Sequence, residues 1–517
     1  MKPTNSHKKV KYKSVIYLLF YLSLFIGITA CSENEPVDDS KVTEEVYGTE
    51  FSQFQFLKSN NPSLAADINL SFENNHVWIN LPLNTDMENL VATFSTNSKT
   101  VLVNGTEQTS DQTGNDFSKE IIYTLNGSEN QTEEYSFNLE KFTGLPIIYL
   151  NTNGQAIDSK EGYRTGTVLV DGNYDYANLN STAMEIKGRG NSTWYTHPKK
   201  PYQMKFDDKT EFLGMPKDKK WLFLAEYSDK TLLRNKIAFE MGYLSNLDWT
   251  PQSEFAEVFI NEEYAGTYNI TQKLESSENR VNLGDDGYLL EIDQMDRLDP
   301  EDVYFETNDF LINIKEPEIE TNSEAHVYIK ELIIAFETAL HASNFKDPIE
   351  GYAKFIDINS FVDWYLISEI VKNQDSKDFS SIYLNVIPGE KIKMGPLWDF
   401  DLAFGNVDYS DARYPEGFWV KDHTWYARLF EDPKFLTQVK ARFAYFRSKE
   451  TLILDKIDAY TKQLHWAQEK NDNKWNLFGN YVWPNPVYFN THQEEVNHLK
   501  TWYTKRMNWL DTALNSL

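Results

Sequence analysis

Residues 184–206 read MEIKGRGNSTWYTHPKKPYQMKF and hold two strand-like runs on either side of a glycine-containing turn. Apolar and polar residues alternate over 184–187 and over 202–206, and this period predicts β-strands. Gly188 and Gly190 lie between the runs, so we expect a hairpin loop in which the backbone can approach a ligand closely. Free N–H groups in such a loop can bind phosphate oxygens, although an ordinary β-hairpin has the same pattern.

A lysine on the second predicted strand adds a positive charge to this segment. Lys205 follows Gly190 by fifteen residues, and a glycine-rich loop followed by a strand lysine is the order found in protein kinases. Thr193 stands where the third glycine of the kinase motif would be. The candidate nucleotide-binding residues of this segment are Gly188, Arg189, Gly190, Asn191 and Lys205.

A second polar cluster, KNQDSKDFSSIY over residues 372–383, follows a predicted helix and leads into a predicted strand. A carboxylate in such a loop, here Asp375, can orient an attacking hydroxyl and accept its proton. Ser380 lies five residues later, where protein kinases place a metal-binding asparagine. A solvated turn rich in Asp and Asn is the alternative interpretation.

The third cluster, MGPLWDFDLAFGN over residues 394–406, places Asp399 and Asp401 on either side of one aromatic residue. Carboxylate oxygens are hard ligands that suit Mg²⁺, which in turn binds phosphates. We therefore predict Asp399, Asp401 and Ser380 as metal ligands and Asp375 and Lys205 as catalytic residues.

Five ordered motifs resemble the CotH kinase family, the spore-coat protein H kinases: GRGNSTW with KKPYQMKF, LLRNKIAFEM, VFINEEYAGTYNIT, GYLLEID and PLWDFDLAFGN. The resemblance covers about residues 145–409. It implies an atypical protein-kinase-like fold that phosphorylates serine or threonine in proteins with ATP and Mg²⁺. It also implies that Lys205 steadies the α- and β-phosphates, Asp399 binds Mg²⁺ and Asp375 orients the substrate hydroxyl. Glu291, in GYLLEID, is expected near the nucleotide.

Two departures from the family pattern leave another function open. Gln272 stands where relatives often carry glutamate, and Ser380 replaces the expected asparagine with a weaker Mg²⁺ ligand. The alternative is a catalytically weak or inactive CotH-like surface protein that acts in adhesion or in glycan or protein binding. Carbohydrate hydrolysis by a pair of carboxylates is a third hypothesis.

The N-terminus has the pattern of a bacterial lipoprotein signal. Residues 1–14 carry five lysines and no acid, and a sixteen-residue apolar run over 15–30 ends at Cys31, the one cysteine of the chain. The ending ITAC resembles a lipobox, so we expect signal residues 1–31, lipid attachment at Cys31 and a flexible tether over 32–50. This predicts an outer-membrane lipoprotein that faces the periplasm or the cell exterior.

The composition of the 517 residues is that of a globular, multidomain protein, with 41% hydrophobic and 25% charged residues. The formal net charge of −28 argues against nucleic acid as a partner, because such a surface repels polyphosphate. The expected partners are a protein substrate, which the family resemblance implies, and the membrane that holds the lipid anchor.

Periodicity divides the rest of the chain into two parts. Residues 51–143 alternate with period two and contain the turn signals Asn104-Gly105 and Asn126-Gly127, which predicts an antiparallel β-sandwich, and the segment resembles Ig-like modules. Residues 144–517 mix strands with helices, which predicts an α+β domain that ends in a helical region, and the family resemblance implies that this domain is kinase-like. Ser360 and Asp363 have the spacing of a capping box at the start of one predicted helix.

Overall fold

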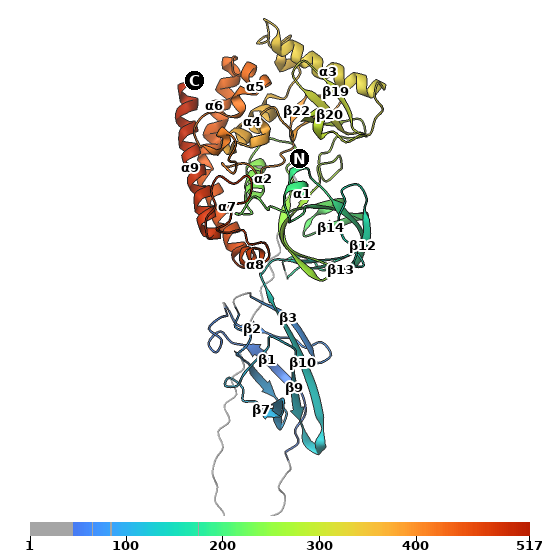
Figure 1. Cartoon of the computed structure of the whole chain (residues 1–517), viewed down its shortest axis with the longest axis vertical. Helices are drawn as coiled ribbons and strands as arrows, with labels where there is room; N and C mark the ends of the chain where they lie inside the picture. Colours follow the sequence, from blue (N-terminus) through green and yellow to red (C-terminus); the bar gives the residue numbers. More distant parts are fainter. Residues whose placement is uncertain (1–44, 65, 83–84, 174) are drawn as a thin grey trace, which may run out of the picture.

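The computed structural model describes residues 45–64, 66–82, 85–173 and 175–517. The predicted signal sequence, the lipid-modified Cys31 and most of the predicted tether lie outside the described residues. Figure 1 shows three regions in chain order: a β-rich region, a β-barrel, and a part with a second sheet and most of the helices. In the described residues, no helix is both long and apolar enough to cross a membrane.

The N-terminal β-rich region has a hydrophobic core of its own. Its main sheets have the strand orders β2-β1-β5 and β3-β10-β9-β6-β7, and β4 pairs with β8. Phe54 and Phe137 are buried between the sheets with ring centroids 4.5 Å apart. Asn104 and Gly105 both have positive φ and form the predicted β6–β7 turn. The strands are β1 (Phe51–Phe56), β2 (Ile68–Asn69), β3 (His76–Pro82), β4 (Leu90–Val91), β5 (Thr93–Thr96), β6 (Thr100–Val103), β7 (Thr106–Glu107), β8 (Gly114–Asn115), β9 (Ile121–Asn126) and β10 (Thr132–Phe142).

One strand pair of this region departs from the antiparallel prediction. Strands β3 and β10 run parallel over Ser136↔His76 to Phe142↔Pro82. Alternation along a strand indicates which residues share a face, but it does not indicate the direction of the neighbouring strand. The β-rich character of residues 51–143 is confirmed, whereas purely antiparallel pairing is wrong.

Residues 147–272 form a closed seven-stranded barrel with the order β11-β12-β13-β14-β15-β17-β16. The parallel pair β11–β16 closes the barrel. Ile186 and Met204 are buried in the barrel core. Since side chains alternate along a strand, Lys187 and Lys205 lie on the outer wall. The strands are β11 (Ile147–Asn151), β12 (Arg164–Asp171), β13 (Leu179–Gly188), β14 (Tyr202–Phe212), β15 (Met215–Leu224), β16 (Ser253–Ile260) and β17 (Glu263–Gln272).

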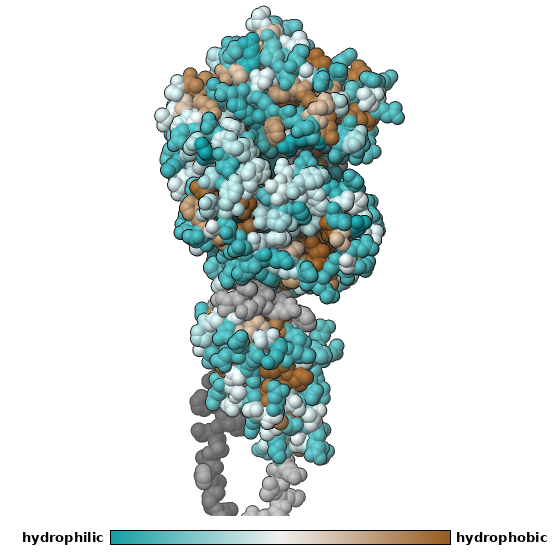
Figure 2. Space-filling view, viewed as in Figure 1, coloured by the Kyte–Doolittle hydropathy of each residue, from teal (hydrophilic) through white to brown (hydrophobic). Residues whose placement is uncertain are grey.

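A second sheet and the longer helices share the largest hydrophobic core. The sheet has the order β19-β20-β18-β21-β22, with every pair antiparallel. Its strands are β18 (Tyr288–Asp293), β19 (Val303–Glu306), β20 (Leu311–Glu316), β21 (Ile382–Val386) and β22 (Lys393–Met394). The helices are α1 (Ser192–Thr196), α2 (Arg234–Tyr243), α3 (Glu324–His341), α4 (Ile358–Val371), α5 (Thr424–Leu429), α6 (Pro433–Ser448), α7 (Glu450–Gln463), α8 (His465–Trp475) and α9 (His492–Ser516). On the face shown in Figure 2, apolar residues form separate patches within a mostly hydrophilic surface.

The mixture of strands and helices and the helical C-terminal region predicted for residues 144–517 are confirmed, but the start of α4 differs from the prediction. Asp357 is the N-cap, and its side chain accepts a hydrogen bond from Ser360 N at 2.7 Å. Asp363 is buried and instead forms an ion pair with Arg442. Both pairings fit a three-residue spacing, and the burial of Asp363 decides between them.

Candidate active site

Two loops bring the three predicted aspartates together. Asp375 lies in the short helical turn Gln374–Ser376 after α4, and Asp399 and Asp401 lie in the loop after β22. Burial and the negative charge of Asp399 raise the pKa of Asp375 to about 7. Burial also raises the pKa of Asp401 well above its ordinary value, and the charges of Asp399 and Asp375 add to the rise. These carboxylates are therefore close enough to repel one another.

Further acids from the barrel enlarge this negative cluster. Glu226 and Asp229 follow strand β15, and their charges also raise the pKa of Asp401. Asp229 is neutralised by an ion pair with Arg234. Burial, followed by the charge of Asp229, raises the pKa of Glu226 to about 8. The raised pKa values show that the ionised forms of these carboxyls repel one another, and a bound cation would favour those ionised forms.

Arg189 is the cation that the structure places at Asp399 and Asp401, while the charge of Arg297 acts on Asp375 and opposes the rise of its pKa. Its guanidinium interacts with the charges of Asp399 and Asp401, while burial lowers its pKa. The guanidinium carbon lies 5.5 Å from the ring centroid of Trp398, so the indole orients the charged group. Arg189 directly follows β13, which links the outer wall of the barrel to the acid cluster.

Left-handed backbone occurs at three non-glycine residues of the site. Asp399 has φ 64°, Ser381 has φ 59° and Glu226 has φ 48°. Such conformations cost energy for residues with a Cβ and are often found at functional sites. Ser381 donates from its backbone N to Glu291 Oε1 at 3.1 Å and from its Oγ to Asp399 Oδ2 at 3.4 Å. Glu291 therefore holds Ser381 beside Asp399.

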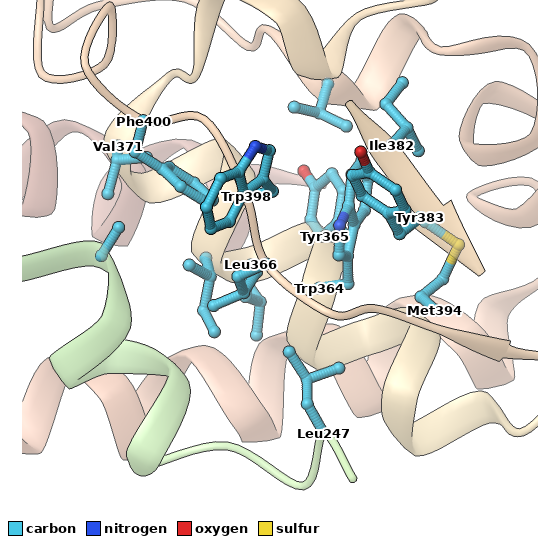
Figure 3. Packing of buried hydrophobic residues seen from close by; sticks show 14 of the residues in the cluster. Leu247, Trp364, Tyr365, Leu366, Val371, Ile382, Tyr383, Met394, Trp398 and Phe400 are labelled. Atoms are coloured by element: carbon cyan, nitrogen blue, oxygen red, sulfur yellow. The ribbon is translucent and has the colours of Figure 1, made fainter. Parts of the chain in front are cut away.

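The loop that carries Asp399 is fixed by the core and by polar contacts from α2. Figure 3 shows its aromatic neighbours Trp398 and Phe400 packed among buried hydrophobic residues. Phe400 N donates to Asn235 Oδ1 at 2.7 Å. Asn235 Nδ2 donates to both carboxylate oxygens of Glu226 at 3.1 Å. Asn235 thus connects the barrel acid to the loop of the aspartates.

Lys205 does not join the three aspartates. It pairs in register with Glu185 on the neighbouring strand, and its Nζ lies 2.6 Å from Glu185 Oε2. Glu185 precedes Arg189 by four residues, or about 13 Å along a strand. The sequence order of a kinase is present, but the position of Lys205 along β14 keeps its amine away from the acids. Lys187 lies between Glu185 and Arg189 on the same wall, and both lysines lie over the Tyr163 ring.

The turn after β13 is the predicted hairpin, but two of its N–H groups are not free. Gly188 N donates to Ser159 O at 2.8 Å and Arg189 N to Pro201 O at 3.2 Å. A Cβ at Gly188 would lie 2.2 Å from the Trp194 ring, so glycine is required there for packing. Gly190 has φ 82°, a value that favours glycine. The expectation of a loop with free N–H groups is therefore wrong at the first two positions.

The remaining predicted residues lie around this centre. Asn191 accepts a hydrogen bond from Lys160 Nζ at 3.1 Å. Ser380 is buried, and its Oγ has no hydrogen-bond partner within the described residues, whereas Ser381 contacts Asp399. The sequence reasoning missed Ser381, Glu226 and Asn235. The presence of a second acid, Asp229, three residues after Glu226 was the one signal for Glu226.

The carboxylates of the site suit Mg²⁺, although they do not by themselves complete its coordination shell. Across the described ranges, no three His, Cys, Asp or Glu side chains form a ready-made metal site. Mg²⁺ usually takes one or two carboxylates and completes its shell with phosphate and water oxygens. The excess of hard carboxylate oxygens at Asp399 and Asp401 fits that mode.

A cavity of about 400 Å³ lies elsewhere, at one end of the barrel. Its lining includes Tyr202, Tyr264, Tyr268 and Trp475, together with Lys200, and none of the aspartates of the cluster. Lys200 Nζ is bonded to the carbonyls of Trp194 and His197 at 2.6 Å. The cavity is therefore distinct from the acidic site.

Comparison with known proteins gives one informative match. The model of the CotH kinase protein family matches residues 186–510, which include all three aspartates and most of the barrel. The curated proteins contain no match to the chain. A crystal structure described as a "putative glycoside hydrolase" from Bacteroides thetaiotaomicron is 12% identical over 56% of this chain and 88% of its own. The TM-score of this match is 0.16.

Proposed function

Because the chain belongs to the CotH kinase family, we propose that it is an atypical protein kinase that phosphorylates serine or threonine with ATP and Mg²⁺. The observation that carries this proposal is the meeting of Asp375, Asp399 and Asp401 beside Arg189. These residues come from loops far apart in the sequence. Clustered acids that repel one another are costly unless a cation is bound.

Asp399 and Asp401 would hold Mg²⁺, and Ser380 Oγ is a buried oxygen available to support it. Bound Mg²⁺ supplies charge neutralisation of the phosphates. Arg189 adds a second positive charge at the same point. Lys187 and Lys205 extend this positive wall along the barrel, where the α- and β-phosphates of ATP would lie, in line with the family resemblance. Gly190 and Asn191 would complete the phosphate-binding turn next to Arg189.

Asp375 would act as the catalytic base. The acceptor hydroxyl oxygen forms the new bond to the γ-phosphorus, and the bond from that phosphorus to the leaving oxygen of ADP breaks. The hydroxyl proton passes to a carboxylate oxygen of Asp375. A pKa near 7 matches this task, because the carboxyl can accept a proton at neutral pH. Glu291 would act indirectly, since it holds Ser381 against Asp399.

Labelled ATP tests this proposal directly. Purified chain with γ-labelled ATP and Mg²⁺ is expected to transfer label to itself or to a generic protein acceptor. Asp399→Ala is expected to abolish transfer, and Asp375→Ala to reduce it strongly. Asp455→Ala, at an exposed position of α7, is the matched control and should transfer normally. Transfer that survives Asp399→Ala, or that proceeds equally with EDTA, would overturn the metal assignment.

The second candidate is a CotH-like surface protein that binds a glycan or protein without catalysis. The replacement of the expected asparagine by Ser380 motivates it. Binding that is unchanged in Asp375→Ala and Asp399→Ala, together with the absence of any transfer, would favour this candidate.

We also propose that the mature chain is a lipoprotein anchored through Cys31 in the outer membrane. The support is the lipobox-like ITAC ending of the apolar run. Metabolic labelling with a fatty acid should mark the wild-type chain and fail to mark Cys31→Ser. Label on the serine variant would overturn the assignment.

A further inference from the structure

Two loops next to the acid cluster expose aromatic rings. Tyr409 lies in the loop that follows the aspartates, and Tyr481, Trp483 and Tyr488 lie in the connection between α8 and α9. Each of the four is between 41% and 53% exposed. The rings of Tyr409 and Trp483 are nearly parallel, at 14°, with centroids 6.0 Å apart. These four residues are called the aromatic platform below.

The aromatic platform adjoins the catalytic base. Ser410, the neighbour of Tyr409, donates a hydrogen bond to Gln374, the neighbour of Asp375. Burial and then the charges of Asp375 and Asp401 raise the pKa of Tyr409 to about 12. The hydrogen bond between their neighbours therefore places the loop of Tyr409 beside the loop of Asp375.

Hydrogen bonds hold the second loop against the loop of the aspartates. Asn485 Nδ2 donates to Asn406 Oδ1 at 2.9 Å and to Ser228 O at 2.6 Å. The hydroxyl of Tyr481 donates to Asp408 Oδ2 at 2.8 Å. These contacts fix the ring faces before a ligand arrives, which lowers the entropic cost of binding.

The chemistry of the aromatic platform favours a neutral carbohydrate. Every exposed large apolar residue in residues 405–414 and 477–490 is aromatic, and none is aliphatic. The loops of the aromatic platform, residues 405–414 and 477–490, contain no groove between helices and no open strand edge. Binding of a peptide as a helix in a groove, or as an added strand, therefore has no support here. Flat aromatic faces suit the C–H face of a pyranose ring, and the nearby Asp408 and Asp375 oxygens can accept its hydroxyl protons. The same carboxylates disfavour an anionic ligand.

We propose that the aromatic platform binds a neutral oligosaccharide chain carried by the phosphoryl acceptor, so that the substrate is a glycan-bearing protein. The substrate assignment rests on the proposed kinase function. The binding itself does not, because it needs neither ATP nor metal.

Calorimetric titration of the full chain tests the binding. The probes are cellohexaose, maltohexaose, xylohexaose, mannohexaose and chitohexaose, each without nucleotide and with EDTA. At least one is expected to bind, and Tyr409→Ala and Trp483→Ala are expected to weaken its affinity at least about tenfold. Tyr304→Ala, at an exposed tyrosine of strand β19, is the matched control and should bind normally. Unchanged thermal unfolding shows that each variant is folded.

Three results would overturn the proposal: no binding of any of the five sugars, binding unaffected by both platform variants, or platform-dependent binding of a proline-rich or basic peptide alone. Asp399→Ala should retain sugar binding and lose phosphoryl transfer. Sugar binding without transfer in the wild-type chain would therefore reject the kinase function alone. Transfer to a generic protein with no sugar binding would reject the aromatic platform alone.

Discussion

Replacing Asn235 by leucine is expected to destabilise the protein strongly, although the two side chains have the same number of heavy atoms and the same branching. Asn235 lies at the second position of α2 and is 4% exposed. Its amide makes three hydrogen bonds, two to the Glu226 carboxylate at 3.1 Å and one from Phe400 N at 2.7 Å. Leucine can make none of them.

The size of the expected loss of stability follows from the buried polar groups that Asn235→Leu leaves without hydrogen-bond partners. Glu226 keeps the bond from Asn269 Nδ2 to its Oε1 at 3.2 Å, so Oε2 is left unpaired. Phe400 N–H also loses its acceptor. Each buried unpaired group costs about 1 to 3 kcal/mol, so Asn235→Leu should lower the free energy of unfolding by about 2 to 6 kcal/mol. That is a large part of the ~5 to 15 kcal/mol typical of a folded protein.

Urea unfolding monitored by tryptophan fluorescence measures the stability of the part of the chain that contains Asn235. Of the 13 tryptophans, Trp78 alone lies in the N-terminal β-rich region. Asn497→Leu is the matched control, because it makes the same chemical change at an exposed position of α9 and should change stability by less than about 0.5 kcal/mol. An Asn235→Leu variant as stable as this control would refute the reasoning that Asn235 connects Glu226 to the aspartate loop.

Gly188→Ala should lower the free energy of unfolding by about 1 to 3 kcal/mol, and with it the melting temperature, because its Cβ would lie 2.2 Å from the Trp194 ring. An unchanged melting curve would contradict this prediction. Arg506→Met should lower the free energy of unfolding, measured with urea, by about 3 to 5 kcal/mol, because it leaves the buried Glu369 without the arginine of its ion pair. A urea midpoint equal to that of the wild type would contradict this prediction. Burial lowers the pKa of His423 from 6.5 to about 3. Between pH 6.5 and about 3, His423 is therefore protonated in the unfolded chain but neutral in the folded chain. The free energy of unfolding of the wild type should fall by up to about 1.4 kcal/mol for each pH unit of acidification in this range. His423→Phe should lose correspondingly less between pH 6.5 and 4.5, and parallel stability curves would rule out this role.

Local pattern in the sequence determined the strands, the helices and the family. Alternation over 184–187 and 202–206 gave the β13–β14 hairpin, because one face of each strand fills the barrel core. The predicted helical C-terminal region contains α6, α7 and α9, each of which buries one stripe of apolar residues. Helix α4 differs, because it is buried on all sides. These properties depend on neighbours within a few residues, so they can be read along the chain.

The tertiary structure alone decided which strands close the barrel, which cation meets the acids and what surrounds the base. Arg189, between the two glycines of the turn, and Lys205, on the strand that follows, are both basic, yet the structure places the first at Asp399 and pairs the second with Glu185. Glu226, Asn235 and Tyr409 reach the site from three separate segments. Their positions depend on how distant elements pack, and the sequence pattern near each residue carries no information about a partner that lies more than a hundred residues away.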